Sequence, residues 1–203
     1  MAEDKPDITS AAAAALSDPR AAYKLLEIDA KFRLLRAGRS VLDLGSAPGG
    51  WAQVAAAQGC PVVGVDLLEI DPIAGVVLLQ GDLFEAATID RVLAITDGPV
   101  EVLLSDLAAS STGQRTVDRL RAEGLAEAVL AMLPNLLARN GHLVLKLLRG
   151  AEANVGDFAR RRFAKVKLMR PEATRRESSE IYLVGQRYRG DPAGDGNEQH
   201  GGE

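Results

Sequence analysis

Three aspartates and a glycine-rich turn are the residues best suited to bind a small ligand. The turn, Gly45-Ser46-Ala47-Pro48-Gly49-Gly50-Trp51, follows an apolar run that contains Asp43. It has no glycine at the second position of the G-x-G-x-x-G pattern of a dinucleotide site, and it lacks the Lys and Ser/Thr of a Walker loop. A carboxylate so close to the turn would repel a polyphosphate and attract a cation.

Two further acids follow later apolar runs, in the order that a nucleoside site needs. Asp66 ends the second run, 21 residues after Gly45, close to the spacing expected of an acid that binds ribose hydroxyls. Asp82 follows the third run, where it could accept a hydrogen bond from an adenine amino group. S-adenosylmethionine joins adenosine to an ammonium group and a sulfonium without any phosphate, so the three acids together predict it as the cofactor. Each acid alone could equally be a turn residue or a helix cap.

The predicted cofactor site joins the turn, the three aspartates, two of their neighbours and the acid that ends the fourth apolar run. No metal-ligand set is predicted. The members of the site are Asp43, Gly45, Ser46, Ala47, Pro48, Gly49, Gly50, Trp51, Asp66, Leu67, Asp82, Leu83 and Asp106.

A second set of polar residues could catalyse a transfer reaction. Asp106 ends the run "LLSD", and Lys146 lies inside the run "LVLKLL". A lysine within an apolar strand is unusual, because burying its charge without a partner is costly. The alternative is an edge strand whose lysine extends into solvent. Lys24 in "RAAYKLLEID" and Glu180 in "SSEIYLVG" would, taken alone, be ordinary surface charges.

A dense basic segment could contact nucleic acid, although the formal net charge of −4 excludes a chain covered in positive charge. Eight lysines and arginines lie between Arg160 and Arg176, opposed only by Glu172. The alternative is a solvated face. Aromatic residues make up only 4% of the chain, so base stacking should contribute little. The predicted RNA-binding residues are Arg20, Lys31, Arg160, Arg161, Arg162, Lys165, Lys167, Arg175 and Arg176.

The apolar pattern of the sequence predicts strands and helices in alternation, and these would position the residues named above. Short apolar runs such as "VLLS" suit strands buried on both faces, which predicts an α/β fold with a doubly wound, mostly parallel seven-stranded sheet and helices on both faces. The last two strands follow each other without a helix, so one antiparallel edge strand is expected. The predicted strands are Val41–Leu44, Val62–Asp66, Val76–Gln80, Val100–Ser105, His142–Leu147, Ala164–Met169 and Ile181–Arg187, and the predicted helices are Asp18–Leu35, Trp51–Gln58, Thr88–Thr96, Gln114–Arg139 and Ala153–Arg162.

The length and composition predict one folded domain at residues 18–189, after a flexible N-terminal segment at 1–17 and before a disordered, acidic, Gly-rich tail at 190–203. The single cysteine, Cys60, cannot form an intrachain disulfide. No segment has the length of a membrane span or the pattern of a signal peptide. We therefore expect a cytoplasmic monomer that has no membrane contact and needs no obligate protein partner.

Six motifs, taken in order, resemble the RrmJ/FtsJ family of ribose 2′-O-methyltransferases. They are "RAAYKLLEID", "VLDLGSAPGGW", "DLLEIDPIAGVVLLQGD", "LLSDLAASSTG", "LVLKLLRG" and "FAKVKLMRPEATRRESSEIYLVG". The resemblance runs from Arg20 to Arg187 and implies a Rossmann-like class I methyltransferase fold. The third motif is most similar to bacterial members, which implies 2′-O-methylation of a uridine in 23S rRNA on the assembled large ribosomal subunit.

The resemblance also implies a Lys-Asp-Lys-Glu catalytic tetrad at Lys24, Asp106, Lys146 and Glu180, with S-adenosylmethionine as methyl donor. A ribose hydroxyl must lose its proton to attack the methyl group, and Lys146, if neutral, is the expected base. Asp106 would orient the lysine amine while the other two members position the ribose and its phosphate. The chain departs from the bacterial pattern in the segment 108–110, which reads Ala-Ala-Ser, and at Ser179, where an arginine is common.

Three other functions compete with this one. A related enzyme could methylate a tRNA ribose by the same chemistry. A ribosome-assembly factor could bind RNA without catalysis, although all four tetrad positions carry the required residue types. A small-molecule methyltransferase would need an apolar substrate pocket or lid, for which the chain has little spare length, and would leave the basic segment unexplained.

Overall fold

The computed structural model describes residues 16–109, 112–175 and 178–191, and within them strands and helices follow the predicted order. The predicted N-terminal segment and tail fall outside these ranges except for residues 16–17 and 190–191. No helix in the described ranges is long and apolar enough to cross a bilayer. The elements are α2 (Pro19–Phe32), β1 (Val41–Leu44), α3 (Gly50–Ala57), β2 (Val62–Asp66), β3 (Val76–Gln80), α4 (Ala86–Thr96), β4 (Val100–Ser105), α5 (Arg115–Leu136), β5 (Leu137–Leu148), α6 (Glu152–Arg162), β6 (Phe163–Met169) and β7 (Glu180–Tyr188).

The seven strands form one sheet in the order β3-β2-β1-β4-β5-β7-β6. The pairs from β3 to β5 are parallel, which confirms the predicted doubly wound topology. The sheet also has one antiparallel strand, as predicted, but this strand is β7 and not the edge strand. It lies between β5 and the edge strand β6 and is antiparallel to both. The strand order reverses between β1 and β4, and a crevice at their carboxyl ends is where such sheets bind ligands.

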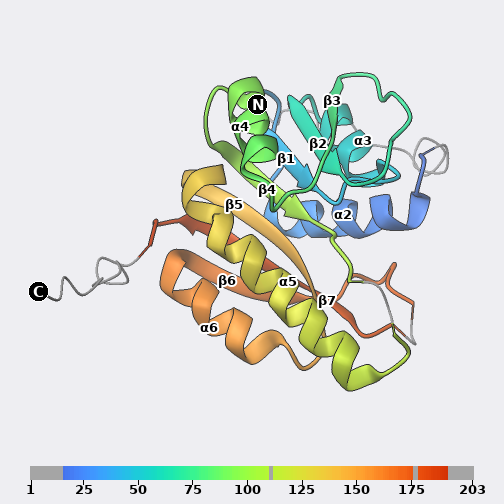
Figure 1. The fold of residues 1–203 in the computed structure, drawn as a ribbon, viewed down its shortest axis with the longest axis vertical. Helices are drawn as coiled ribbons and strands as arrows, with labels where there is room; N and C mark the ends of the chain where they lie inside the picture. Colours follow the sequence, from blue (N-terminus) through green and yellow to red (C-terminus); the bar gives the residue numbers. More distant parts are fainter. Residues whose placement is uncertain (1–15, 110–111, 176–177, 192–203) are drawn as a thin grey trace, which may run out of the picture.

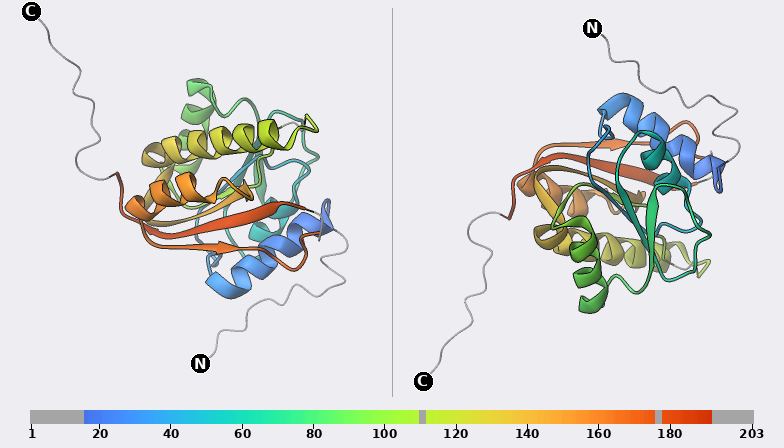
Figure 2. Two further views of the ribbon diagram at one scale, coloured as in Figure 1. Left: turned by 90° about the horizontal axis from the view of Figure 1, so that it is seen from below. Right: turned by 90° about the horizontal axis from the view of Figure 1, so that it is seen from above.

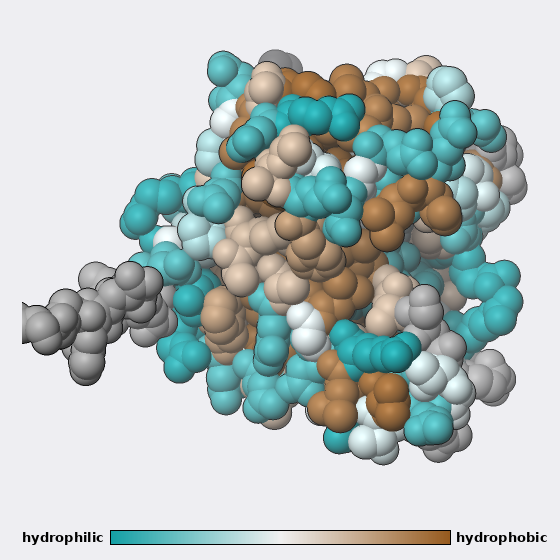
Figure 3. All heavy atoms as spheres, in the orientation of Figure 1, coloured by the Kyte–Doolittle hydropathy of each residue, from teal (hydrophilic) through white to brown (hydrophobic). Residues whose placement is uncertain are grey.

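Two helical layers cover the sheet (Figures 1 and 2). Helices α2 and α3 pack on one face, and α4, α5 and α6 pack on the other. Strands β1 and β4 are buried almost throughout, since each contributes alternate residues to both cores. On the face that carries α5 and α6, hydrophilic and hydrophobic residues are interspersed (Figure 3). Because the helices cover both faces of the sheet, a ligand site is expected at the carboxyl ends of its strands.

Helix α2 begins as predicted at the Asp18 cap, whose carboxylate accepts the N–H groups of Arg20 and Ala21, both at 3.0 Å. It ends at Phe32, three residues before the predicted Leu35. The cause is a local C-cap, because Arg33 has a left-handed φ of +53° and Asp29 Oδ1 accepts the N–H groups of Leu34 and Leu35 at 2.7 and 2.8 Å. These bonds satisfy the backbone N–H groups that follow the helix as the chain leads to β1.

The other boundary error lies at the junction of α5 and β5. The predicted helix ran to Arg139, whereas α5 ends at Leu136 and β5 starts at once with Leu137. Leu137 pairs with Val100 of β4, so strand pairing ends the helix without a loop. The end of the helix and the start of the strand are both apolar here, so the sequence pattern does not show where one ends and the other begins.

We expect Asp29→Ala to lower the free energy of unfolding by about 2–4 kcal/mol, because two backbone N–H groups would be left buried without an acceptor. Urea denaturation followed by circular dichroism measures this. Asp18→Ala is the matched control, since it removes an exposed cap and should cost only about 1 kcal/mol. A loss for Asp29→Ala no larger than that of the control would contradict this account of the helix end.

Candidate active site

The structure brings the four tetrad residues together at the carboxyl ends of β4 and β5. Lys24 on α2 forms an ion pair with Glu180 at the start of β7, with 2.7 Å between Nζ and Oε2. Lys146 on β5 forms a second ion pair with Asp106, with 3.2 Å between Nζ and Oδ1, and it donates to the Asp106 backbone carbonyl as well. Both lysine side chains are only 10% exposed. Two buried cations and two carboxylates therefore compensate each other in pairs.

Strand register explains why these residues meet. In the antiparallel pair of β5 and β7, Lys146 lies opposite Tyr182 and Leu148 lies opposite Glu180. Directly opposed residues point to the same face of a sheet, so Lys146 and Tyr182 share the face covered by α2. The alternative of an edge strand with an extended lysine is wrong, because β5 lies between β4 and β7.

Tyr182 belongs to the site although the sequence analysis did not select it. Its hydroxyl donates to Asp106 Oδ1 at 2.9 Å, the same oxygen that faces Lys146. Its ring lies 5.9 Å from Lys24 Nζ and 5.7 Å from the ring of Trp51. Fully buried, Tyr182 contacts both ion pairs. The available signal was its place two residues after Glu180, on the same face of the strand.

The electrostatic environment favours the ionised form of Glu180 and the neutral form of Tyr182. Burial alone would raise the pKa of Glu180, but the hydrogen bond and charge of Lys24, together with the charge of Lys146, lower it below its usual value. Burial, followed by the negative charges of Asp106 and Glu180, raises the pKa of Tyr182, so the phenol stays a hydrogen-bond donor. Asp106 therefore receives bonds from a lysine and from a neutral phenol.

The crevice at the reversal of strand order contains a buried carboxylate. Asp43 of β1 is 1% exposed, and its Oδ2 accepts a hydrogen bond from Ser46 Oγ at 2.9 Å. Its Oδ1 is buried without a hydrogen-bond partner among the described residues. Burial raises the pKa of Asp43 from 3.8 to about 7, opposed by the Ser46 bond and reinforced by the negative charge of Asp106. An unsatisfied carboxylate oxygen of this kind suits a cationic ligand.

The other predicted cofactor residues lie in turns at the same carboxyl end of the sheet. Asp66 accepts the N–H groups of Ala47 and Leu68, each at 2.9 Å, so it holds the glycine-rich turn against the end of β2. Asp82 accepts the N–H of Phe84 at 2.9 Å and shapes the turn after β3. Beside these acids, Leu67 is 66% exposed and Leu83 is buried. Apolar side chains also follow β2 and β3 on the surface, in the upper part of Figure 3.

The glycine-rich turn needs its glycines for space as well as for conformation. Gly45 has a φ of +74°, and a Cβ there would lie 2.6 Å from a methyl group of Leu107. Gly49 has a φ of +110° and closely approaches Ile73. Gly50 packs against the backbone of Asp18, where a Cβ would lie 2.8 Å from the carbonyl oxygen. The turn therefore packs against α2 and against the loops that follow β2 and β4.

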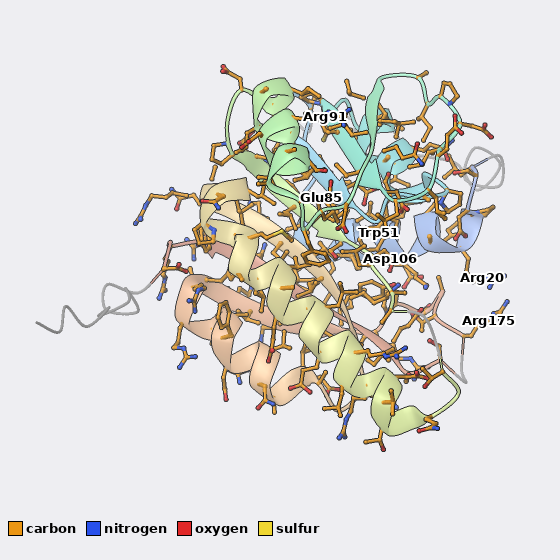
Figure 4. The ribbon with its side chains drawn as sticks, viewed as in Figure 1. Arg20, Trp51, Glu85, Arg91, Asp106 and Arg175 are labelled. Atoms are coloured by element: carbon orange, nitrogen blue, oxygen red, sulfur yellow. The ribbon has the colours of Figure 1, made fainter. Side chains whose placement is uncertain are left out.

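Trp51 ends the turn, and its side chain acts as a structural anchor. The indole N–H donates to the Ala21 carbonyl of α2 at 2.8 Å, and the side chain is 3% exposed. Figure 4 shows Trp51 close to Asp106 near the centre of the molecule, and Tyr182 contacts both. Trp51 thus connects the predicted cofactor turn to the tetrad through packing.

A cavity of about 650 Å³ opens beside the tetrad, between α5 and the end of β5. This volume is in the range of small-molecule sites and could hold one nucleotide. Its lining includes two tetrad residues as well as two arginines, one from α5 and one from the loop after β5, and Ser179, where the family pattern often has an arginine. The relevant residues are Leu107, Arg119, Lys146, Arg149, Ser179 and Glu180.

The basic segment that could contact nucleic acid does not form one continuous surface. Lys165 and Lys167 on β6 line a hollow together with Lys31, on the face covered by α2. Arg160 and Arg161 lie on α6, which covers the opposite face (Figure 2), and Arg160 pairs with Asp157. The linear run is therefore divided by the sheet.

Arg162 is a correction to the predicted RNA-binding set. It is 5% exposed, its Nε donates to Asp191, and its guanidinium lies 3.5 Å from the centre of the Phe158 ring. A side chain held in this way cannot reach a phosphate. Arg20 and Arg175 are exposed, at the right-hand margin of Figure 4, whereas Arg176 and Ser110 lie outside the described residues.

Comparison with known proteins confirms the resemblance drawn from the motifs. A family model described as FtsJ-like methyltransferase matches residues 18–188. "Ribosomal RNA large subunit methyltransferase E" of Acidiphilium cryptum is 48% identical over 175 residues, which cover 85% of this chain and 77% of that protein. The protein of the same name from Rhodopseudomonas palustris (strain BisA53) is 44% identical over 178 residues, covering 84% and 76%. A crystal structure of a Plasmodium falciparum protein assigned as a ribosomal RNA methyltransferase has a TM-score of 0.76 and 27% identity, covering 84% of this chain and 98% of that one.

Because the pKa of Asp43 is raised in the folded chain, the free energy of unfolding should depend on pH. Between about pH 4 and pH 7 the folded chain keeps a proton that the unfolded chain has released, so the free energy of unfolding falls as pH rises through this window. Without cofactor at pH 8, Asp43→Asn should therefore raise the free energy of unfolding by up to about 4 kcal/mol, and at pH 5 by less than about 2 kcal/mol, because only part of the window has been crossed. Urea denaturation at both pH values measures this.

Asp90→Asn is the control for this stability experiment, since Asp90 is exposed on α4 and its replacement should change little at either pH. A destabilisation by Asp43→Asn of equal size at pH 5 and pH 8 would contradict the prediction. That result would mean that the hydrogen bond of Asp43 to Ser46 outweighs the cost of its buried charge.

Proposed function

The chain belongs to the FtsJ-like methyltransferase family, and from this premise we propose that it methylates the 2′-hydroxyl of a uridine ribose in 23S rRNA, with S-adenosylmethionine as donor. The observation that carries the proposal is the presence of two adjacent ion pairs at the carboxyl ends of β4 and β5. Lys24 pairs with Glu180, and Lys146 pairs with Asp106. The pairs adjoin both the Asp43 crevice and the nucleotide-sized cavity. A cofactor and a ribose held on either side would meet at the tetrad.

The crevice fits S-adenosylmethionine by the chemistry of its side chains. The unsatisfied Oδ1 of Asp43 suits the cationic end of the cofactor, and the acids Asp66 and Asp82 suit its ribose and adenine. Gly45 and Gly49 let the turn pack closely against Leu107 and Ile73, which fixes its backbone in place. Leu67 and Leu83 would flank the adenine ring. When bound, the cofactor supplies a methyl group activated by a sulfonium.

The chain's own task is to orient the ribose and to remove its proton. We assign this proton transfer to Lys146, which accepts the 2′-hydroxyl proton on Nζ when it is neutral. Asp106 holds that amine through both its carboxylate and its backbone carbonyl, and Tyr182 fixes the carboxylate in turn. Lys24 and Glu180 orient the ribose and its phosphate. Such alignment can contribute several kcal/mol to lowering the barrier.

The proposed substrate is rRNA of the large ribosomal subunit, acted on in the cytoplasm by a monomer. Support comes from the relatives that carry this activity in their names at 44–48% identity. The α/β domain has no appended RNA-binding module in the described residues, so a folded target within an assembled particle would supply the contacts that naked RNA lacks. Label transfer to large subunits and to tRNA, both from cells lacking the protein, separates this substrate from the tRNA alternative.

We expect Lys146→Ala to reduce methyl transfer to large subunits by about 10²–10⁴-fold, because the reaction loses its base. Lys146→Arg should be similarly inactive, since an arginine keeps the charge and the donors but does not release its proton. The measurement is transfer of labelled methyl from S-adenosylmethionine, with cofactor binding followed separately by calorimetry.

Arg91→Ala serves as the control for this assay, because Arg91 is an exposed cation on α4 and should leave the rate unchanged (Figure 4). Substantial activity of Lys146→Arg would show that the position requires only a positive charge. A cellular role that survives Lys146→Ala would favour the non-catalytic assembly factor.

The affinity for S-adenosylmethionine should increase about tenfold between pH 6 and pH 8, because the cation binds to ionised Asp43, whose pKa is about 7 without ligand. Binding at pH 6 must then release a proton to the buffer. Calorimetry in two buffers of different ionisation enthalpy measures both the affinity and the proton count. Asp43→Asn should bind more weakly, with a flat pH profile, and a wild-type affinity independent of pH would exclude the proposed contact.

A further inference from the structure

We propose that the hollow formed by Lys31, Lys165 and Lys167 is a second RNA-binding site, which grips backbone phosphates of the substrate a few nucleotides away from the methylated ribose. The inference rests on the proposed function and adds where the substrate docks. The hollow has a volume of about 410 Å³, and its lining also includes Phe32, Leu168 and Gln186. No acidic side chain of the described residues belongs to this lining.

The three lysines converge from elements that are distant in sequence. Lys165 lies directly opposite Gln186 in the antiparallel pair of β6 and β7, and Lys167 lies two residues farther on the same face. Gln186 Nε2 donates to the Phe32 carbonyl at 3.2 Å, which joins the end of α2 to this part of the sheet. Lys31, next to Phe32, completes the cluster, and all three lysines are exposed.

Exposed cations lie at both ends of one stripe of α2. Arg20, Lys24, Glu27 and Lys31 are spaced four, three and four residues apart, so they share this stripe of the helix. Lys24 is paired with Glu180, and Glu27 accepts the N–H groups of Glu172 and Ala173 at 2.6 and 2.8 Å. The exposed cations of the stripe are therefore Arg20 and Lys31.

The distance from the tetrad fits a single strand of RNA that runs along the surface. Lys31 follows Lys24 by seven residues, or roughly 10 Å along the helix axis. Counted along β7, Glu180 and Gln186 are six residues, or roughly 20 Å, apart. A phosphate bound in the hollow would therefore belong to a neighbouring nucleotide and not to the target itself.

The half-buried His142 lies beside the hollow, because it is directly opposite Gln186 in the register of β5 and β7. Its pKa is lowered to about 4, first by burial and then by the charges of Arg39 and Arg36, with Glu101 opposing. His142 is therefore neutral at pH 7 and adds no charge of its own next to the lysines. With three lysines and no acid in the lining, a polyanion is the partner whose charge fits the hollow.

The experiment compares a triple variant, Lys31→Ala/Lys165→Ala/Lys167→Ala, with a control, Arg91→Ala. The control removes an exposed cation of α4, on the opposite face of the sheet from the hollow. For each protein, the KM and kcat for large subunits and the binding of deproteinised 23S rRNA are measured between 50 and 300 mM salt. Cofactor affinity and thermal unfolding confirm that each variant is folded.

We expect the triple variant to raise KM about tenfold to hundredfold with kcat within about twofold of the wild type. The slope of log K against log salt should fall by about 2–3, in line with three lost phosphate contacts. The control should keep the wild-type KM and slope. Unchanged KM and slope in the triple variant, or an equal loss in the control, would overturn the proposal.

The design separates this site from the reaction. If wild-type protein transfers no methyl group to rRNA, the proposed function fails, while the rRNA-binding slopes still decide whether the hollow contacts RNA. If the triple variant loses activity on large subunits but binds deproteinised rRNA normally, the hollow contacts a ribosomal protein and the RNA proposal is wrong.

Discussion

The antiparallel pairing of β7 with β5 is the constraint on which the site depends. This register places Glu180 and Tyr182 beside Lys146, at the edge where β4 delivers Asp106. Because buried charges are costly without partners, each lysine there needs its carboxylate and each carboxylate needs its lysine. Tyr182 joins the two pairs through its hydroxyl and its ring. A shift of one residue in this pairing would move Glu180 and Tyr182 to the opposite face of the sheet and break up the tetrad.

Two opposite electrostatic requirements meet at this edge of the sheet. The predicted cofactor site is acidic, and burial raises the pKa of Asp43 there to about 7. The hollow between α2 and β6 is lined by three lysines, whereas Asp29 and Glu27 of α2 accept backbone N–H groups. The sheet and helix α2 keep these regions apart while allowing both to reach the tetrad. A cationic donor and an anionic acceptor can therefore approach from different sides.

The sheet also decides which charges act together. The segment from Arg160 to Lys167 reads as one basic cluster, but helix α6 ends and strand β6 begins within it. Its arginines consequently lie on one face and its lysines on the other, and Arg162 turns inward to pair with Asp191. Charge density along a sequence is a one-dimensional property. Binding depends on which charges share a surface, and strand alternation and helix packing determine that.

The sequence was sufficient for the order of strands and helices and for the doubly wound sheet, because these rest on apolar runs that are local in the chain. Its motifs implied the four tetrad residues through the family resemblance. The Asp18 cap was also readable, since it bonds only to the next few residues. Tertiary structure decided the start of β5 at Leu137 and the partners of Lys24 and Lys146. It also decided the role of Tyr182 and the division of the basic segment. The physical reason is that these features depend on contacts between residues far apart in the chain, such as Lys24 and Glu180, and only the register of the sheet brings such residues together.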